Sequence, residues 1–519
     1  MKTNIYETYY NAYQPYMLLD FNLSFDNDIP HDDICRTVLE VTERINLCKY
    51  VDFSNRNSHG YDAFMMFNLV ILAKALFGYA STRDLEKLCQ TDIRFMFIAK
   101  NQKPSHQSFH RFIHDDLTMN IEDIFYDINK YLESNMDIDT DVLCIDGTKY
   151  EANANKNTFI WRANTVRNRT KRWKRTLNCI HKINNYFSSV NISTRYSLLK
   201  EPSIDYLLTI SERLEKYMLD QNIQMVHGKG CRKPAIQKLY EELKENALKM
   251  WEYAIHMDML QNRNSCSKTD PDATFMHMKY DYYNHTNVFK PGYNIQFGIS
   301  DGNDLKTYIP FMKKYKEAYG KLPKRTPADA GYGSYDNYSY CKENNIELYM
   351  KYSGYYKERE KATQKNQFKL IHFKRDEKNQ FVCPAGHTFE LEKETIDRQG
   401  EYERINKHYV NRHCEGCPLR SKCTKAKNGR TLVRCDKLEE YHQEARSNVT
   451  SDEGIKLMKK RSNESEGTFG DLKYNQKYDR LRRRGEAGVK LEIYLIAIGE
   501  NLRKYHRNKM KEKEKKQIN

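Results

Sequence analysis

Three acidic residues, far apart in the chain, are candidates for metal-assisted chemistry. Asp146 follows the apolar run 142–145, Asp329 follows Pro327-Ala328, and Glu466 lies in the helical pattern 461–473. Each aspartate is where a strand-like run stops and a turn begins. Carboxylates held on rigid elements can bind two Mg²⁺ (or Mn²⁺) ions, about 3.5–4 Å apart, that stabilise both reacting oxygens of a phosphodiester. Any one of these residues alone is more often a turn residue or a solvated glutamate, so the prediction depends on their combination.

The predicted helix around Glu466 places three side chains on one face. Glu466, Phe469 and Lys473 are spaced i, i+3 and i+7, which aligns them along a helix. We expect Phe469 to pack on a sheet and Lys473 to contact a phosphate near the ions. Glu464 is a rival metal ligand, but the spacing to Lys473 favours Glu466.

Charge points to a polyanionic partner. The chain has 86 Lys and Arg against 70 Asp and Glu, a net charge of +16, and cationic surfaces bind nucleic acid through counterion release. Residues 162–182 hold eight Lys or Arg and no acid, with Trp161 and Trp173 beside them. Basic residues with aromatic rings favour DNA binding, although a solvated helix face remains the alternative. The predicted DNA contacts are Trp161, Arg172, Lys174, Arg175, Arg461, Lys473, Arg482, Arg483 and Arg484.

A cysteine cluster predicts a structural zinc ion. Cys414 and Cys417 form a two-residue-spaced pair, and tetrahedral Zn²⁺ needs two further ligands. Cys383 and Cys423 are the best completions, with His387, His413 and Cys435 as competitors. The charged segment 352–440 has few apolar residues, so an ion would replace part of a core. Unligated thiols in a reducing cytosol are the alternative, because the other cysteines are scattered singly through apolar segments.

The chain length suggests several domains. Residues 1–135 read as short helices: a buried helix at 63–79, a capping box at 81–84 and a helix start at Pro104-Ser105. This pattern is typical of a helix-turn-helix unit, which either binds DNA or only packs. The most apolar window, 63–80, is interrupted by Asn68 and Lys74, so we expect a buried helix and no membrane association. No signal peptide is visible in 1–20.

Strand and helix patterns alternate through the middle of the chain and predict an α/β fold. Strand-like runs (141–146, 293–299, 325–329, 346–350) alternate with helical runs (309–319, 335–343). We predict a mixed-sheet catalytic core from 136–351 and 441–505, interrupted by a helical insertion at about 160–265 and a small zinc-ribbon-like insertion at 352–440. The tail 506–519 lacks an apolar period and is predicted to be disordered.

Taken together, these motifs resemble the DDE-type transposases of bacterial insertion sequences, which have an RNase H-like catalytic core. The similar segments are 146–155 (first Asp), 269–273 and 291–296 (middle block), 328–333 (second Asp), 460–473 (Glu), Arg482–Gly485 with Asn501, and 32–115 (helical N-terminal domain). Related transposases also carry a cysteine cluster between the second Asp and the Glu. One departure concerns an arginine that a related branch has four positions before Glu: Ser462 stands there, and Arg461 lies one step earlier.

The resemblance implies a DNA transposase. Asp146, Asp329 and Glu466 would bind two Mg²⁺ ions for end cleavage and strand transfer. Its partners would be double-stranded DNA, namely terminal inverted repeats and a target, and pairing two ends implies at least a homodimer. A cytoplasmic, nucleoid-associated location would follow. The alternatives are a domesticated DNA-binding protein that does not cut, or a zinc-dependent RNA-binding protein.

Overall fold

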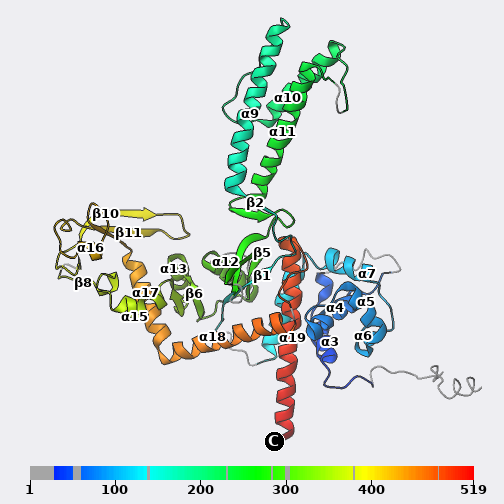
Figure 1. Ribbon diagram of the computed structural model, residues 1–519. Helices are drawn as coiled ribbons and strands as arrows, with labels where there is room; N and C mark the ends of the chain where they lie inside the picture. Colours follow the sequence, from blue (N-terminus) through cyan, green and yellow to red (C-terminus); the bar gives the residue numbers. More distant parts are fainter. Residues whose placement is uncertain are drawn as a thin grey trace, which may run out of the picture. The chain divides into compact units, whose positions relative to one another are not determined.

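A computed structural model describes residues 28–50, 60–136, 141–228, 232–281, 285–297, 304–377, 380–476 and 478–518 (Figure 1). The described chain mixes helices with several small sheets, as the α/β prediction requires at its coarsest level. Two compact units are present: residues 1–138 with 493–519, and residues 139–492. The predicted N-terminal domain includes 1–27 and 51–59, which lie outside the described residues.

The first unit is helical. Local signals set its helix ends: Asp33 and Asp62 cap two helix starts, Ser81 and Asp84 form the predicted capping box, and Ser105 begins the helix after Pro104. The apolar run forms one almost fully buried helix, which ends at Gly78 with a φ of 66°, a backbone conformation that glycine adopts without a Cβ penalty. The helices are α3 (Ile34–Glu43), α4 (Ala63–Phe77), α5 (Thr82–Thr91), α6 (Ile93–Ile98), α7 (His106–Arg111) and α8 (Ile121–Ser134).

The C-terminal tail is helical, and the prediction of disorder from residue 506 is wrong. Helix α19 (Gly485–Ile518) continues to the end of the described chain. Leu502 and Tyr505 are buried, His506 Nδ1 lies 2.8 Å from Thr37 Oγ1, and Lys509 forms an ion pair with Glu40. The last turns extend a helix that is already packed, and their Lys and Glu residues are good helix formers. The second half of α19 thus belongs to the first unit, whereas the sequence assigned 441–505 to the core.

The second unit is built on strands that converge around Asp146. Strand β1 (Asp146–Glu151) pairs antiparallel with β5 (Thr286–Phe297), which pairs antiparallel with β4 (Thr274–Asp281). On the other side, β6 (Ala328–Gly333) and β7 (Met350–Tyr352) are parallel. Helices α12 (Asp304–Tyr319) and α13 (Tyr335–Glu343) precede and follow β6, as predicted. A tyrosine-rich core including Tyr308, Tyr332 and Tyr338 fills the space between these helices and strands.

The helical insertion has a core of its own. It contains α9 (Arg162–Ser189), α10 (Ile204–Asp220) and α11 (Ala235–Leu260). Apolar residues at helical spacing from all three, such as Ile180, Leu207 and Leu243, form one buried cluster. The short pair β2 (Phe159–Trp161) and β3 (Ser265–Ser267) closes the base of this hairpin-like insertion (Figure 1).

The cysteine-bearing insertion, hereafter the Cys module, spans 353–435. Its small core contains Phe373, Phe381, Phe389, Tyr409 and Leu432. Its elements are α14 (Tyr355–Arg359), α15 (Lys361–Gln364), β8 (Lys374–Arg375), β9 (Phe381–Val382), β10 (Glu390–Asp397), β11 (Arg404–Asn411), α16 (Arg420–Cys423) and β12 (Arg430–Arg434). Helices α17 (Asp436–Thr450) and α18 (Asp452–Gly470) follow, and α18 runs into the π-helical turn η4 (Asp471–Asn475).

Hydropathy gives no clear membrane signal. Among the described residues, no single helix is long and apolar enough to cross a bilayer. Helices α4 and α5 meet the length and composition criteria only together, across a bend of 95°.

Candidate functional site

The segments that lead into Asp146 and Asp329 lie side by side in parallel. The segment before β1 runs parallel to the segment before β6: Val142 pairs with Arg325, and the backbone N–H of Ile145 donates to Pro327 O (3.2 Å). Continued for four residues, this offset sets Asp146 opposite Asp329 on the same face. Because neighbouring strands lie about 4.8 Å apart, two carboxylates in this register can share metal ions.

The two aspartates lie where strand pairing changes, not where strands end. Asp146 is the first residue of β1, and Asp329 is the second residue of β6. Each carboxylate accepts a hydrogen bond from a following glycine N–H, Gly147 at 2.9 Å and Gly331 at 2.8 Å. The sequence predicted strand ends at these aspartates because it does not show how strands pair. The apolar segment before Asp146 pairs with the segment before Asp329. After the aspartates, β1 pairs with β5 and β6 pairs with β7.

Helix α18 reaches the first aspartate through Arg461. Its Nη1 lies 3.5 Å from Asp146 Oδ1, and only 16% of the arginine side chain is exposed. The rival ligand Glu464 lies by Cys144: burial raises the pKa of this thiol to about 12, and the Glu464 carboxylate adds to the shift. The structure places Glu466 in α18, but the side chains of Glu466 and Phe469 lie outside the described residues.

Lys473 contacts β1 directly. Its Nζ donates to Thr148 Oγ1 (2.5 Å) and Lys149 O (3.0 Å) and lies over the Tyr150 ring at 4.7 Å. Burial lowers the pKa of this amine, because desolvation disfavours the charged form. The predicted phosphate ligand is thus anchored within a few residues of Asp146.

The predicted arginine run lies along the end of β1. Arg484 Nε donates to Asn153 O (2.6 Å), and Asn153 Nδ2 donates to Arg482 O (2.7 Å). The buried Glu492 carboxylate accepts from the backbone N–H groups of Arg482 and Arg483. These backbone bonds fix the loop at the Glu151 end of β1, the end opposite to Asp146.

The basic helix α9 divides into inward and outward residues. Arg172 bonds Asn246 Oδ1 (3.1 Å), pairs with Glu245 and is only 19% exposed, so much of its charge is used within the insertion. Trp173 is buried in the insertion core, where its Nε1 donates to Leu199 O (3.3 Å). Lys174 and Arg175 are exposed, as is Trp161. The sequence could not show which of these residues are buried and which are exposed. The partners of the buried ones lie on α11 and in the loop before α10.

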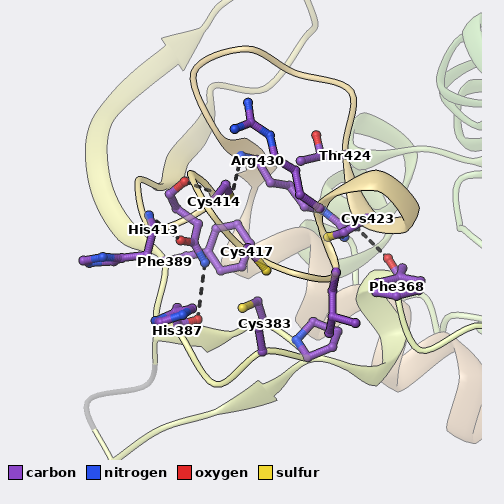
Figure 2. Close-up of a pocket in the computed structure, with 15 residues that line it drawn as sticks. Phe368, Cys383, His387, Phe389, His413, Cys414, Cys417, Cys423, Thr424 and Arg430 are labelled. Carbon is purple, nitrogen blue, oxygen red and sulfur yellow. Dashed lines mark hydrogen bonds between the residues drawn. The ribbon is translucent and has the colours of Figure 1, made fainter.

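The four predicted zinc ligands surround one small cavity (Figure 2). Cys383, Cys414, Cys417 and Cys423 line a space of ≈ 20 Å³, enough for about one water-sized species. The competitors His387 and His413 also line it, with their rings stacked at 5.3 Å. Cys435 belongs to the tyrosine-rich core instead. Among the described residues, no three His, Cys, Asp or Glu side chains are arranged closely enough to hold a metal ion.

Tight turns and N–H donors prepare the thiols for a ligand role. Gly386 (φ 85°) and Gly416 (φ 73°) adopt the left-handed conformation just after Cys383 and between Cys414 and Cys417. The backbone N–H of Arg430 points to Cys414 Sγ (3.4 Å), and its guanidinium donates to Cys423 Sγ (3.0 Å).

The hairpin β10–β11 joins the Cys module to the helix that follows the Asp329 strand. The Tyr402 backbone N–H donates to Asp336 Oδ1 (3.3 Å), and the Tyr402 hydroxyl donates to the Glu343 carboxylate. The Tyr335 hydroxyl donates to Glu403 O (3.0 Å). A Cβ at Gly400 would lie 2.3 Å from an Asp336 oxygen, so glycine permits this approach. The sequence did not predict this contact.

His442 gives a testable pH dependence. Its ring stacks on Tyr352 (4.0 Å, 15°) and lies edge-on to Tyr338; the charged groups around it are Glu358, Arg446, Arg434 and Arg404. Burial lowers its pKa from 6.5 to about 4. The folded state therefore keeps His442 neutral, while the unfolded chain takes up a proton below pH ~6.5.

Stability should thus fall as the pH drops from about 6.5 to about 4, by up to roughly 3 kcal/mol from this residue. His442→Phe, which retains the stack, should flatten that slope in urea unfolding at several pH values. His181→Phe, at an exposed site on α9, is the control. Equal slopes for wild type and His442→Phe would contradict the assignment.

Two family models match parts of the chain. A family model described as Transposase DDE domain matches residues 382–506, which include the Glu466–Lys473 segment. A second, described as Transposase domain (DUF772), matches residues 23–115 in the helical unit. Comparisons with curated proteins and with solved structures gave no match. The two matches, which follow one another in chain order, support a DDE-type insertion-sequence transposase.

Proposed function

We propose that this protein cuts the ends of an insertion sequence and joins them to target DNA, with Asp146, Asp329 and Glu466 as the metal-binding triad. The observation that carries this proposal is the parallel pairing of the segments that lead into Asp146 and Asp329. It is supported by the mixed arrangement of antiparallel and parallel strands, which suits an RNase H-like core, and by α18, which brings the Glu466 segment past β1.

The donor set suits hard divalent cations. Carboxylate oxygens are the ligands that Mg²⁺ and Mn²⁺ prefer, and two such ions would activate water and stabilise the departing oxygen. Asp146 and Asp329 would hold the ions from adjacent strands. Arg461, paired with Asp146, would bind DNA phosphates next to the cut bond, and the Arg482–Arg484 loop would bind phosphates at the other end of β1. Lys473 would keep β1 and η4 together through its contacts with Thr148 and Lys149.

Further surfaces would hold the rest of the DNA. Exposed Lys174 and Arg175 on α9 suit phosphate contacts along a duplex, and the helices α5 to α7 suit recognition of the terminal repeat. Synapsis of two ends would require at least a dimer. Such an enzyme would work in the cytoplasm, on the nucleoid.

A structural zinc ion is part of the proposal. Cys383, Cys414, Cys417 and Cys423 would bind it, because a set of four thiols suits tetrahedral zinc and all four line one cavity. The N–H donors of Arg430 would offset the negative charge of the thiolates. The ion would replace the core that this small module lacks.

A cleavage assay tests the proposed function. Labelled DNA carrying the sequences that flank the gene is incubated with the protein and Mg²⁺, Mn²⁺ or Ca²⁺, and Asp146→Ala serves as the control. We expect nicked ends and strand-transfer products only with wild type in Mg²⁺ or Mn²⁺. If wild type and Asp146→Ala behave alike, a non-cutting DNA-binding protein is the better description. If RNA binds as tightly as duplex DNA across a salt series, the RNA-binding alternative holds.

A further inference from the structure

Five aromatic rings gather where β2 meets β4 and the part of β5 that lies beyond its pairing with β1. They are Phe159 and Trp161 of β2, Phe275 and His277 of β4, and Phe289 of β5, here called the aromatic face. The Phe275 ring stacks parallel to Phe289 (5.0 Å, 2°) and meets Phe159 and Trp161 edge-on at 5.0 Å. His277 lies against Phe289 at 5.3 Å.

These rings remain accessible. Trp161 is 39% exposed and Phe289 46%. Strand side chains alternate between faces, and the opposite face of the same strands is packed: Lys290 pairs with the buried Glu151, and the sulfurs of Met276 and Met278 approach Gly292. The aromatic face is therefore an exposed apolar surface on a strongly cationic chain, and such surfaces mark binding sites.

Charge and position indicate what covers this face. Lys149, three residues after Asp146 on β1, donates from Nζ to His277 O (2.9 Å). The basic helix α9 starts at Arg162, immediately after Trp161. An occupant must therefore present flat apolar surfaces together with negative charge. Nucleobases of single-stranded DNA have this combination, whereas a paired duplex hides its base faces.

We propose that the aromatic face stacks unpaired bases of the DNA end that is processed at Asp146 and Asp329. This inference rests on the proposed function and adds a substrate feature to it: the enzyme would prefer an end whose terminal bases are unpaired. Trp161 and Phe289, both exposed, would contribute most of the stacking. Trp173, which the sequence also suggested for stacking, is buried in the insertion core and takes no part.

The test compares two DNA probes on the full chain, with Ca²⁺ in place of Mg²⁺. One probe is a paired duplex; the other carries a short unpaired extension with 2-aminopurine. Wild type should bind the extended probe about tenfold more tightly and quench its fluorescence, as base–aromatic stacking predicts. Trp161→Ala and Phe289→Ala should lose this preference while binding the paired duplex about as wild type does. Trp161→Phe should retain part of it.

The matched control is Trp251→Ala, which removes an exposed tryptophan (54%) from α11; it should leave the preference intact. The inference is overturned if Trp161→Ala and Phe289→Ala keep the preference, or if Trp251→Ala loses it equally. It is also overturned if the two variants change only the oligomeric state in size-exclusion chromatography, since the face would then bind a second copy. If wild type cuts DNA without any preference, this inference alone fails; if it binds neither probe, the proposed function fails as well.

Discussion

Replacing Asp146 or Asp329 with asparagine is expected to reduce DNA end cleavage by at least about 10³-fold. Metal ions supply several kcal/mol of charge stabilisation to phosphodiester cleavage, and each 1.36 kcal/mol corresponds to about tenfold in rate. Asparagine keeps the size and the oxygen that accepts from Gly147 or Gly331, but it removes the charge that holds the ion. Folding should be little affected, because asparagine can still accept the glycine N–H bond at each position.

Three measurements separate this effect from a loss of structure. Single-turnover cleavage should collapse, Mn²⁺ binding followed by electron paramagnetic resonance should weaken, and duplex binding by anisotropy should stay within about twofold, since phosphate contacts come from other residues. Asp220→Asn, at the exposed end of α10, is the matched control for lost charge and should cleave normally. Cleavage by Asp146→Asn within tenfold of wild type would rule out the triad.

Replacing Cys414 and Cys417 with serine is expected to remove bound zinc and unfold the Cys module locally. The small core cluster of this module consists of five buried apolar residues, whereas structural zinc contributes on the order of 10 kcal/mol to the folding of small domains. Zinc content by mass spectrometry should fall from one equivalent to none. Limited proteolysis should then cut within 366–430, a segment that wild type protects.

Cys48→Ser removes an exposed thiol of the first unit and should change neither measurement. Cleavage should also fall in the Cys414/Cys417 variant, because the tip of the β10–β11 hairpin holds α13 through Asp336 and Glu343. Purified wild-type protein without zinc, together with an unchanged proteolysis pattern in the variant, would show that these residues are ordinary reduced thiols.

Local features of the fold were predictable from sequence. The buried helix α4, the capping box at Ser81 and the helix starts at Ser105 and Tyr335 depend on residues within one or two turns. The presence of a sheet was also predictable. Its pairing was not, because β1 pairs with β5 across the whole helical insertion, and alternation along one strand does not name its partner.

The site was predictable in composition but not in contacts. Two aspartates could be named as ligands, yet their shared register depends on the backbone of 142–145 meeting 325–327. Arg172 was expected on DNA, but Asn246 and Glu245 of α11 bind it. The tail from His506 was predicted to be disordered because it has no apolar period of its own. Its contacts are with Thr37 and Glu40, near the other end of the chain, and the sequence does not reveal them.

The stacking of His442 on Tyr352 has a consequence for how such enzymes diversify. The chain leaves the sheet at Tyr352, the last residue of β7, and returns in α17, where His442 meets that same ring. The two ends of the Cys module are therefore adjacent, so its length places no geometric demand on the strands that flank it. Lineages could enlarge, shorten or exchange this module while β6 and α18 stay in place. The long sequence interval between Asp329 and Glu466 would then reflect the size of the inserted module. It would not indicate how far apart the two residues lie in space.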